Sequence, residues 1–597
     1  MQDPPGIIAR PRELLFVCAA AVALAILMTW PLATGLGHMG RTLSTDGDGQ
    51  YSIWNVAWVA RTLVADPIHL FDANIFFPHR TTLAYSEANL LEGALGVPVY
   101  WLTRNPLLTL NVVLLFAFAS AYVCAYLFLR YITGDRRAAA VAAILYAFCP
   151  YVLSHLSHIQ LLMTGGIPLS LLMLHRVVDL VDFRLKAEAR DQTADALDRT
   201  AEATDPIISI PVASAFRRKI TSHGVALGLA LAAQALSCAY YGIYAGLMVG
   251  YATLIFATTR RLWKSSPYWL AIAAAFVTSI AIVLPFFLPY LRVQDETGFR
   301  RTLDDALKNS ATLNIYLASA ARSHAWLLAI ARRYGPVREV LFPGVLALVL
   351  GAAGLVLAAR GGRRDHARWR EREAALLYGS LAAIAFWASF GPAAGLYRVL
   401  FHLPTFSLLR APARFGLVVV FGLTVLAAIA LRHLFDAIPG RGRNLAAAVA
   451  CAAAIADVTV IPIRWYRAPD VPSPYAELAR RPRGPVAEFP FYGERKAFPL
   501  HTQYMLFSTL HWMPLVNGYS DVIPRDFREA AVVLDSFPSS DVFKVLARYR
   551  VRYIAVHWDM FGPRQDEIRR RLTPYAANLM MLASDDRMTL YEVIRYP

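Results

Sequence analysis

Two aspartates lie one residue apart in a polar, glycine-rich segment of this 597-residue chain. Asp46 and Asp48 belong to the run Thr45-Asp-Gly-Asp-Gly-Gln50. Two such carboxylates can bind a divalent cation such as Mg²⁺ or Mn²⁺ together, or one can act as a general base while the other orients it. The alternative is a solvated turn, because Asp and Gly favour turns for local reasons. We take the pair as candidate catalytic residues and a possible metal site.

Two histidines farther along the chain are candidates for a partner of this pair. His155 and His158 are spaced i, i+3, which can place both rings on one face of a helix. There they could bind a metal together with Asp48 or contact a substrate. The alternative is that they end a helix at the membrane interface. Three residues near the aspartates are further candidates for substrate binding: His79, Arg80 and Glu87.

Positive charge for an anionic substrate is available near two apolar runs. Arg410 and Arg414 are spaced i, i+4 around Pro412, near the expected first turn of a helix. A guanidinium group binds phosphate or carboxylate in a bidentate geometry. The alternative is an anchor to lipid headgroups. Arg338 and Glu339 precede another apolar run and are similar candidates.

The composition is that of a membrane protein. Apolar residues make up 57% of the chain, charged residues 17%, and the mean hydropathy is +0.42, whereas soluble proteins carry about 25% charged residues. The apolar residues are concentrated in runs of about 17–25 residues, the length that a helix needs to cross a bilayer. We expect a mainly α, polytopic protein of about eleven transmembrane helices, at residues 14–36, 107–130, 138–153, 159–181, 222–240, 243–259, 267–290, 341–359, 375–390, 415–435 and 444–463.

The net charge of +17 reflects loop anchors on a membrane protein. The basic residues form short clusters between the apolar runs, so the expected partner is the lipid bilayer and not a nucleic acid. The richest cluster is 360–370, and the loops 154–158 and 240–242 carry no Lys or Arg. The positive-inside rule then places the N-terminus in the cytoplasm and the C-terminus outside the inner (plasma) membrane.

The organisation follows from this topology. Residues 1–465 are the expected transmembrane domain, and 466–597 are a soluble, extracytoplasmic α/β domain. The first contains an outer loop at 37–106, a polar cytoplasmic linker at 182–221 and an outer segment at 291–340. That outer segment is basic, against the charge rule, and we expect it to form amphipathic helices on the membrane surface. The soluble domain has expected strands at 486–490, 551–557 and 588–596 and helices at 527–536, 541–549 and 565–572.

The arrangement resembles the GT-C glycosyltransferases, a superfamily of multi-pass membrane proteins. Shared features are the cytoplasmic N-terminus, acidic residues in the first long outer loop, about eleven spans and an outer C-terminal domain. Bacterial GT-C-like membrane proteins have short motifs similar to those at 339–344 (Glu-Val-Leu-Phe-Pro-Gly), 409–415 (Leu-Arg-Ala-Pro-Ala-Arg-Phe), 516–520 (Val-Asn-Gly-Tyr-Ser) and 551–557 (Val-Arg-Tyr-Ile-Ala-Val-His). Aminoarabinose and mannosyl transferases resemble each other around an Asp-Glu pair, where this chain has Asp46 and Asp48.

This resemblance implies a reaction. The donor would be a polyprenyl-phosphate sugar, because nucleotide sugars are normally absent outside the cytoplasm. An outer aspartate would remove the proton from a hydroxyl of a glycan, lipid or protein acceptor, and arginines would hold the leaving phosphate. The alternative is a non-catalytic protein of the same architecture that helps to export or assemble lipid-linked glycans. A secondary transporter is disfavoured, because charged residues inside the spans are sparse.

Overall fold

The computed structural model describes residues 9–43, 47–198, 209–360, 366–403, 406 and 409–597. Within these ranges each of the eleven apolar runs coincides with a helix. Eight segments are long and apolar enough to cross a membrane, and α14 is a shorter apolar helix. The helices are α1 (Pro11–Met28), α4 (Pro106–Thr133), α5 (Arg136–Ala147), α8 (Gly166–Asp198), α9 (Ser209–Ser237), α10 (Ala239–Thr259), α11 (Ser266–Thr297), α14 (Val345–Arg360), α15 (His366–Ser389), α17 (Gly416–Ala437) and α18 (Gly442–Val458). The predicted polytopic helical fold is confirmed.

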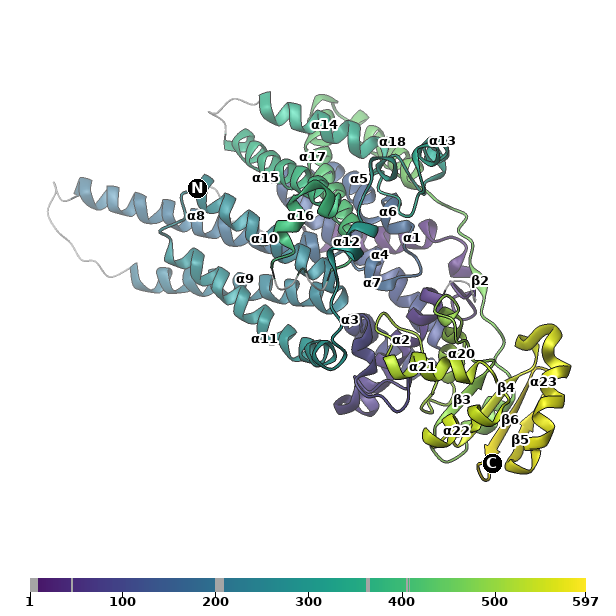
Figure 1. Cartoon of the computed structure of the whole chain (residues 1–597). Helices are drawn as coiled ribbons and strands as arrows, with labels where there is room; N and C mark the ends of the chain where they lie inside the picture. The colour runs from purple at the N-terminus through teal and green to yellow at the C-terminus, as the bar shows by residue number, and fades with distance from the viewer. Residues whose placement is uncertain (1–8, 44–46, 199–208, 361–365, 404–405, 407–408) are drawn as a thin grey trace.

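Helix α17 forms the centre of one half of the bundle, where it packs against α14, α15 and α5. Glycines allow the close approach: a Cβ on Gly354 would lie 1.9 Å from the carbonyl oxygen of Leu426, and one on Gly422 would lie 2.6 Å from that of Tyr378. Small residues at such crossings are how membrane helices maximise van der Waals contact. Helix α11 lies at the rim of the bundle (Figure 1). Most of its apolar side chains are exposed or half-buried, as those of a lipid-facing helix would be.

The contacts between loops follow the alternation deduced from the charges. Side chains assigned to the cytoplasmic ends of the helices pair with one another, and side chains assigned to the outer ends meet at the opposite end of the bundle. The pairs at the expected cytoplasmic end are Glu13–Arg130, Arg137–Asn444, Arg260–Glu373 and Glu371–Arg432. The sequence therefore predicted correctly which loops share a side.

Two connecting segments contain helices, which the sequence predicted for 291–340 but not for the linker at 182–221. The linker at 182–221 continues α8 as far as Asp198 and begins α9 at Ser209, and residues 199–208 lie outside the described ranges. The outer segment 291–340 first continues α11 to Thr297. It then forms the short helices α12 (Leu303–Lys308) and α13 (Ala325–Ala331), joined by 3₁₀ turns.

The C-terminal domain is built on a four-stranded sheet with the order β3-β4-β6-β5. Strands β3 (Val486–Phe489) and β4 (Tyr553–His557) are parallel, and β6 (Met588–Val593) pairs antiparallel with β4 and with β5 (Leu579–Ser584). Helices α21 (Arg525–Leu534), α22 (Ser540–Arg548) and α23 (Gln565–Leu572) lie where the sequence predicts them. Strand β5 was not predicted, because Leu579–Ser584 shows no alternation of apolar and polar residues.

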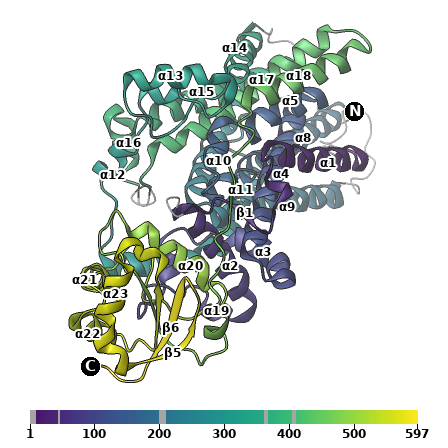
Figure 2. The ribbon, with the colours of Figure 1, turned by 90° about the vertical axis from the view of Figure 1, so that its right-hand side faces the viewer.

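The first outer loop packs against this domain and shares its hydrophobic core, at one end of the helical bundle (Figures 1 and 2). The loop contains helices α2 (Gly47–Ala65) and α3 (Leu90–Thr103). The ring centroids of Trp58 and Trp512 lie 5.5 Å apart, and the amide of Phe76 donates to the carbonyl of Asn517 over 3.1 Å. A short antiparallel strand pair, β1 (Met39–Gly40) and β2 (Tyr466–Arg467), also joins the start of the first outer loop to the start of the C-terminal domain. These contacts hold residues 517–521 above the outer ends of the transmembrane helices.

Candidate active site

The outer segments converge on a polar cavity of about 130 Å³ at the mouth of the bundle. Its walls come from α2, from the segment before α3, from α7 (Ile159–Leu162) and the residue before it, from the start of α10, from the turn before α17 and from the C-terminal domain. The residues that line it are Asp48, Tyr51, Ser52, Ser86, Glu87, His158, Gln160, Tyr240, Arg410, Arg414, Tyr519, Ser520 and Asp521. Segments more than 400 residues apart in the sequence thus form one site.

Asp48 and His158 form an ion pair in this cavity. Asp48 lies in the first turn of α2, and its Oδ2 is 3.2 Å from Nε2 of His158. Gly49 is needed for this placement, since a Cβ there would lie 2.1 Å from the carbonyl oxygen of Arg41. The hydrogen bond from His158 holds the pKa of Asp48 below its usual value, although burial opposes the shift. About half of the Asp48 side chain is exposed, so this ionised carboxylate is accessible to a substrate.

His155 pairs with a different carboxylate. Its Nε2 lies 3.1 Å from Oε2 of Glu339, and its Nδ1 lies 2.7 Å from the carbonyl oxygen of Tyr151. Burial opposes ionisation of Glu339, but the hydrogen bond and charge of His155 outweigh it and lower the pKa of Glu339. The expectation that both histidines share one helical face does not hold, because residues 154–158 are a turn between two short helices. His155 and His158 therefore pair with different carboxylates, those of Glu339 and Asp48.

Arg410 and Arg414 supply positive charge to the same cavity. Arg410 donates from Nη1 to Oδ1 of Asp521 over 2.8 Å, and its backbone amide donates to the hydroxyl of Tyr240. The charge of Asp521 raises the pKa of Arg410. The guanidinium of Arg414 lies 4.2 Å from the ring centroid of Tyr240. Only 8% of Arg414 is exposed, and its Nε has no hydrogen-bond partner among the described residues. Such a buried, incompletely paired cation attracts an anion.

Asp521 was missed by sequence reasoning, although it directly follows the motif at 516–520. Its Oδ1 accepts from Arg410, and its Oδ2 lies 3.5 Å from Nη2 of Arg301. The hydroxyl of Ser86 lies 3.4 Å from the same Oδ2. A single carboxylate of the C-terminal domain thus joins three segments of the outer face. In the sequence, only its position next to this motif could have indicated that Asp521 belongs to the site, because a single Asp forms no spacing pattern with other residues.

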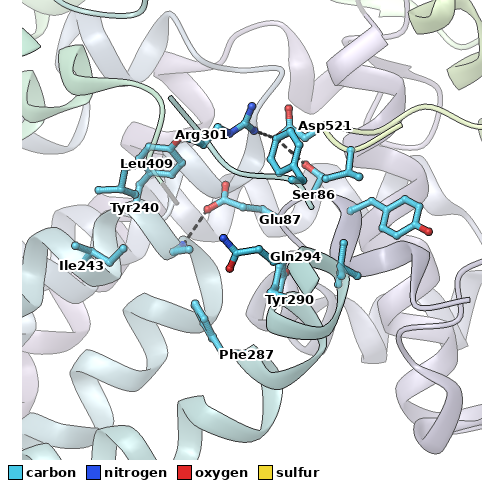
Figure 3. Close-up of a pocket in the computed structure, with 16 residues that line it drawn as sticks. Ser86, Glu87, Tyr240, Ile243, Phe287, Tyr290, Gln294, Arg301, Leu409 and Asp521 are labelled. Carbon is cyan, nitrogen blue, oxygen red and sulfur yellow. Dashed lines mark hydrogen bonds and ion pairs between the residues drawn. The ribbon is translucent and has the colours of Figure 1, made fainter. Parts of the chain in front are cut away.

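Glu87 lines both the polar cavity and an adjoining apolar cavity of about 140 Å³. Figure 3 shows Glu87 among the residues that line the apolar cavity. Its Oε1 accepts from the backbone amide of Ala239 over 2.9 Å, and burial raises the pKa of Glu87. The apolar cavity is lined by Phe287 and Tyr290 of α11 and by Ile243 of α10, among others. It therefore connects the polar cavity to helices at the lipid-facing rim of the bundle.

Five described residues of the predicted site do not line the polar cavity, and one more lies outside the described ranges. Two of the five are His155 and Glu339, which form the pair described above, and the others are His79, Arg80 and Arg338. Nε2 of His79 is 3.0 Å from the carboxylate of Asp526, in a separate groove. Arg80 is exposed and lines none of these cavities. Arg338 is exposed and donates to the carbonyl of Lys308. Asp46 is not among the described residues. Within the described chain, no group of three or more His, Cys, Asp or Glu side chains is arranged to hold a metal ion.

The fold is similar to that of solved membrane glycosyltransferases. The chain matches the arabinofuranosyltransferase AftD from Mycobacteria with a TM-score of 0.53 and 15% identity, over 98% of this chain but 40% of AftD. It also aligns with the oligosaccharyltransferase AglB from Archaeoglobus fulgidus (TM-score 0.46, 15% identity, 92% of this chain and 70% of AglB) and with ArnT from Cupriavidus metallidurans (TM-score 0.36, 13% identity, 98% of each). No protein-family model matches this sequence, and no curated protein sequence does so significantly.

Proposed function

We propose that this chain, which has the GT-C fold, is a membrane glycosyltransferase that takes a sugar from a polyprenyl-phosphate donor and transfers it to an acceptor on the outer face. The observation that carries the proposal is the arrangement of one cavity. An ionised, half-exposed carboxylate, Asp48, faces two arginines across about 130 Å³ of polar space. This space adjoins an apolar cavity beside lipid-facing helices. Base, phosphate site and lipid site are thus contiguous.

The charges fit each step of the transfer. The acceptor hydroxyl attacks the anomeric carbon of the donor and gives its proton to Asp48, which acts as general base. The bond between the anomeric carbon and the phosphate oxygen breaks, and the electron pair leaves with the phosphate. Arg410 and Arg414 would hold the negative charge of that phosphate, as preorganised cations do in phosphoryl sites. His158 orients Asp48 and favours its ionised form.

The lipid part of the donor has a matching environment. The apolar cavity is lined by Phe287, Tyr290 and Ile243, and α11 exposes its apolar side chains toward the bilayer. Burying apolar chain there is favourable by about 25 cal/mol per Å². A polyprenyl chain entering beside α11 would bring its phosphate to the polar cavity at Glu87.

The test is transfer by the full-length protein in liposomes, with a panel of undecaprenyl-phosphate sugars and membrane-extracted acceptors. Asp48→Asn removes the base and keeps the side-chain size, so we expect transfer to fall by about 10²–10⁴-fold. The matched control is Asp66→Asn, because Asp66 forms a similar Asp–His pair with His69 on the exposed side of the same loop. Full activity of Asp48→Asn would contradict the catalytic role and favour the non-catalytic alternative.

The divalent cation expected on Asp46 and Asp48 is a separate proposal. At this point the described residues offer two donor groups, the carboxylate of Asp48 and the imidazole of His158, and these already pair with each other. We therefore derive no step through a metal ion. Chelation with EDTA, followed by addition of Mg²⁺ or Mn²⁺, tests the cation: loss and recovery of transfer would support it, and unchanged transfer would exclude it.

A further inference from the structure

Helix α3 of the first outer loop has an exposed apolar face. Its sequence contains one charged residue, Glu92, and this side chain is fully buried. Ala94, Pro98 and Leu102 are exposed, and their spacing of four residues places them on one side of the helix. Leu102 is 86% exposed. A helix that faces water carries polar residues on its exposed side, so this face is built for an apolar environment.

The neighbours of α3 place this face at the level of the lipid headgroups. Helix α3 ends at Thr103, and α4 begins at Pro106. The 28 residues of α4 span about 42 Å at about 1.5 Å per residue, which matches the thickness of about 40–45 Å of a bilayer with its headgroups. Helix α3 also packs against α9, at the side of the bundle (Figure 2). Its exposed face is thus in position to contact the leaflet next to the C-terminal domain.

Three arginines gather at the end of α3. Arg104 directly follows the helix, Arg61 is on α2, and Arg483 belongs to the C-terminal domain. Burial lowers the pKa of Arg61; the charge of Tyr100 opposes this shift, and the charges of Arg483 and Arg104 add to it. The three guanidinium groups are therefore close enough to repel one another.

The described acids do not neutralise these arginines. The acid whose charge acts on Arg61 is Asp66, and it is paired with Nδ1 of His69 over 2.9 Å. Within the described ranges, Arg61, Arg104 and Arg483 have no side-chain hydrogen bond or ion pair. A site with several unpaired guanidinium groups attracts an anion, and phosphate oxygens fit their planar geometry.

Two of the guanidinium groups lie against tryptophan rings. That of Arg104 is 3.8 Å from the ring centroid of Trp101, and that of Arg61 is 5.5 Å from the ring centroid of Trp512. Trp101 also donates from Nε1 to the carbonyl of Ala60 over 3.1 Å, which holds the end of α3 against α2. Tryptophan and arginine beside an apolar helix face are typical of a membrane interface.

We propose that α3 enters the outer leaflet of the bilayer and that Arg61, Arg104 and Arg483 bind the phosphate of an anionic phospholipid there. The acyl chains of this lipid pack on the apolar face of α3, and its phosphate accepts hydrogen bonds from the guanidinium groups. None of these arginines lines the polar or the apolar cavity of the candidate active site, so this lipid differs from the proposed donor. Because Arg483 belongs to the C-terminal domain, the lipid also ties that domain to the membrane.

The immersion of α3 is tested with nitroxide labels on the full-length protein in phosphatidylglycerol liposomes. A ketone-bearing amino acid that couples to the label replaces Leu102 in one variant and Val532 in the other, so the five cysteines stay unlabelled. Val532 is the matched control, because it is 66% exposed on α21 of the C-terminal domain. Oxygen dissolves in lipid and a charged nickel complex in water, so their effects on the label report its surroundings.

We expect oxygen to relax the label at 102 about fivefold more than the nickel complex does, and the opposite order at 532, because apolar groups partition into lipid. Relaxation mainly by the nickel complex at both positions would overturn the immersion. A label at 102 that is shielded from both reagents would show that protein, and not lipid, covers α3, and this would also overturn the proposal.

The anionic site is tested by native mass spectrometry of the full-length protein released from detergent with added phosphatidylglycerol or phosphatidylcholine. The test variant carries Arg61→Gln, Arg104→Gln and Arg483→Gln. Since Arg61 is half-buried, a second variant carries only Arg104→Gln and Arg483→Gln, at two exposed positions. The matched control carries Arg548→Gln, Arg564→Gln and Arg570→Gln, three exposed arginines of the C-terminal domain.

Both test variants should retain one phosphatidylglycerol molecule fewer than the native chain and the control variant, and all four proteins should retain phosphatidylcholine equally. Equal retention of phosphatidylglycerol by all four proteins would overturn the site. An equal loss of phosphatidylcholine in the test variants would show that the site does not select anionic lipid. Displacement of the phosphatidylglycerol by an equal concentration of inorganic phosphate would assign the arginines to a soluble anion and overturn the lipid assignment.

Discussion

Arg410 and Asp521 lie 2.8 Å apart, from Nη1 to Oδ1, and this ion pair joins the transmembrane part of the chain to its C-terminal domain. The other oxygen of Asp521 faces Arg301. About a third of each paired side chain is exposed, so water and ions reach the pair. In the proposed function, the phosphate of the donor would compete with Asp521 for Arg410, so we expect Asp521 to limit donor affinity.

Removing this competitor should strengthen phosphate binding. We expect Asp521→Asn to bind undecaprenyl phosphate up to about fivefold more tightly, because partly exposed ion pairs are worth about 0.2–1 kcal/mol. Titration of the full-length protein in nanodiscs measures the change. The control is Asp541→Asn, which removes an exposed carboxylate paired with Lys544 on the same domain. Weaker binding by Asp521→Asn would show that Asp521 supports the site instead of competing with the phosphate.

Arg414 should be less tolerant of change than an interface anchor. Arg414→Lys keeps the charge but loses the planar fork, and Arg414→Gln loses both. Since charge-assisted hydrogen bonds are worth about 1.5–3 kcal/mol, we expect Arg414→Gln to weaken undecaprenyl phosphate binding by about ten- to a hundredfold, with Arg414→Lys between it and the native chain. Arg398→Gln is the control, because Arg398 does not line the polar cavity and donates to the carbonyl of Pro392.

The folded state of these variants needs its own measurement, because Arg414 is buried. Size-exclusion elution and the unfolding temperature should match those of the native chain. Equal affinity in the native chain, Arg414→Lys and Arg414→Gln would assign Arg414 to packing over Tyr240 and not to phosphate binding.

The orientation of the chain in the membrane is a further prediction. The charge distribution places the C-terminal domain and the site outside the cytoplasm. A reporter that is active only outside the cytoplasm should be active when fused after Pro597 and silent when inserted near Asp191. The reverse pattern would place the site in the cytoplasm, which contains nucleotide sugars. The argument for a polyprenyl-phosphate donor would then fail, because it depends on the absence of nucleotide sugars.

The sequence predicted the helices, and which loops lie at the same end of the bundle, but only part of the site. Apolar runs of the right length identify membrane helices because the bilayer imposes that length. The alternation of spans and loops along the chain assigned Asp48, His158 and Arg410 to the same side of the membrane, as contact between them requires. It could not show which outer residues touch, because that depends on packing between segments far apart in the chain.

The contacts of Asp521 and His155 could not be predicted from the sequence. Asp521 lies 111 residues from Arg410, and no local pattern connects them. His155 has a spacing typical of a helical face, yet the chain turns at 154–158 and directs its ring to Glu339. Periodicity predicts a face only where the helix is continuous, and short loops between spans often are not helical.

Glu92 should make the stability of the protein depend on pH. It is fully buried on α3, both carboxylate oxygens lack a partner among the described residues, and burial raises its pKa well above the usual value. The folded state therefore binds a proton that the unfolded state releases above its ordinary pKa. As pH rises from the ordinary pKa to the raised pKa, the free energy of unfolding should fall by about 1.4 kcal/mol per pH unit. Below the ordinary pKa, Glu92 should cause no such change.

The comparison of Glu92→Gln with the native chain isolates this effect. Gln resembles the protonated carboxyl group in size and carries no titrating proton. In detergent, the unfolding temperature of Glu92→Gln minus that of the native chain should increase as pH rises from 5 to 8. Parallel curves over this range would indicate that Glu92 is not protonated in the folded state.

The pairing of His158 with Asp48 predicts a shift in the pH profile of transfer. The hydrogen bond from His158 lowers the pKa of Asp48, so the base stays ionised at lower pH than an ordinary aspartate. His158→Phe keeps a ring but removes the donor, so the pKa of Asp48 should rise and the acidic limb of kcat/KM should move to higher pH. His158→Gln, whose amide can still donate, should show a smaller shift. The comparison variant is His155→Gln, because His155 pairs with Glu339 and its loss should leave the acidic limb in place. An unchanged acidic limb in His158→Phe would mean that Asp48 is not the group whose ionisation controls the reaction.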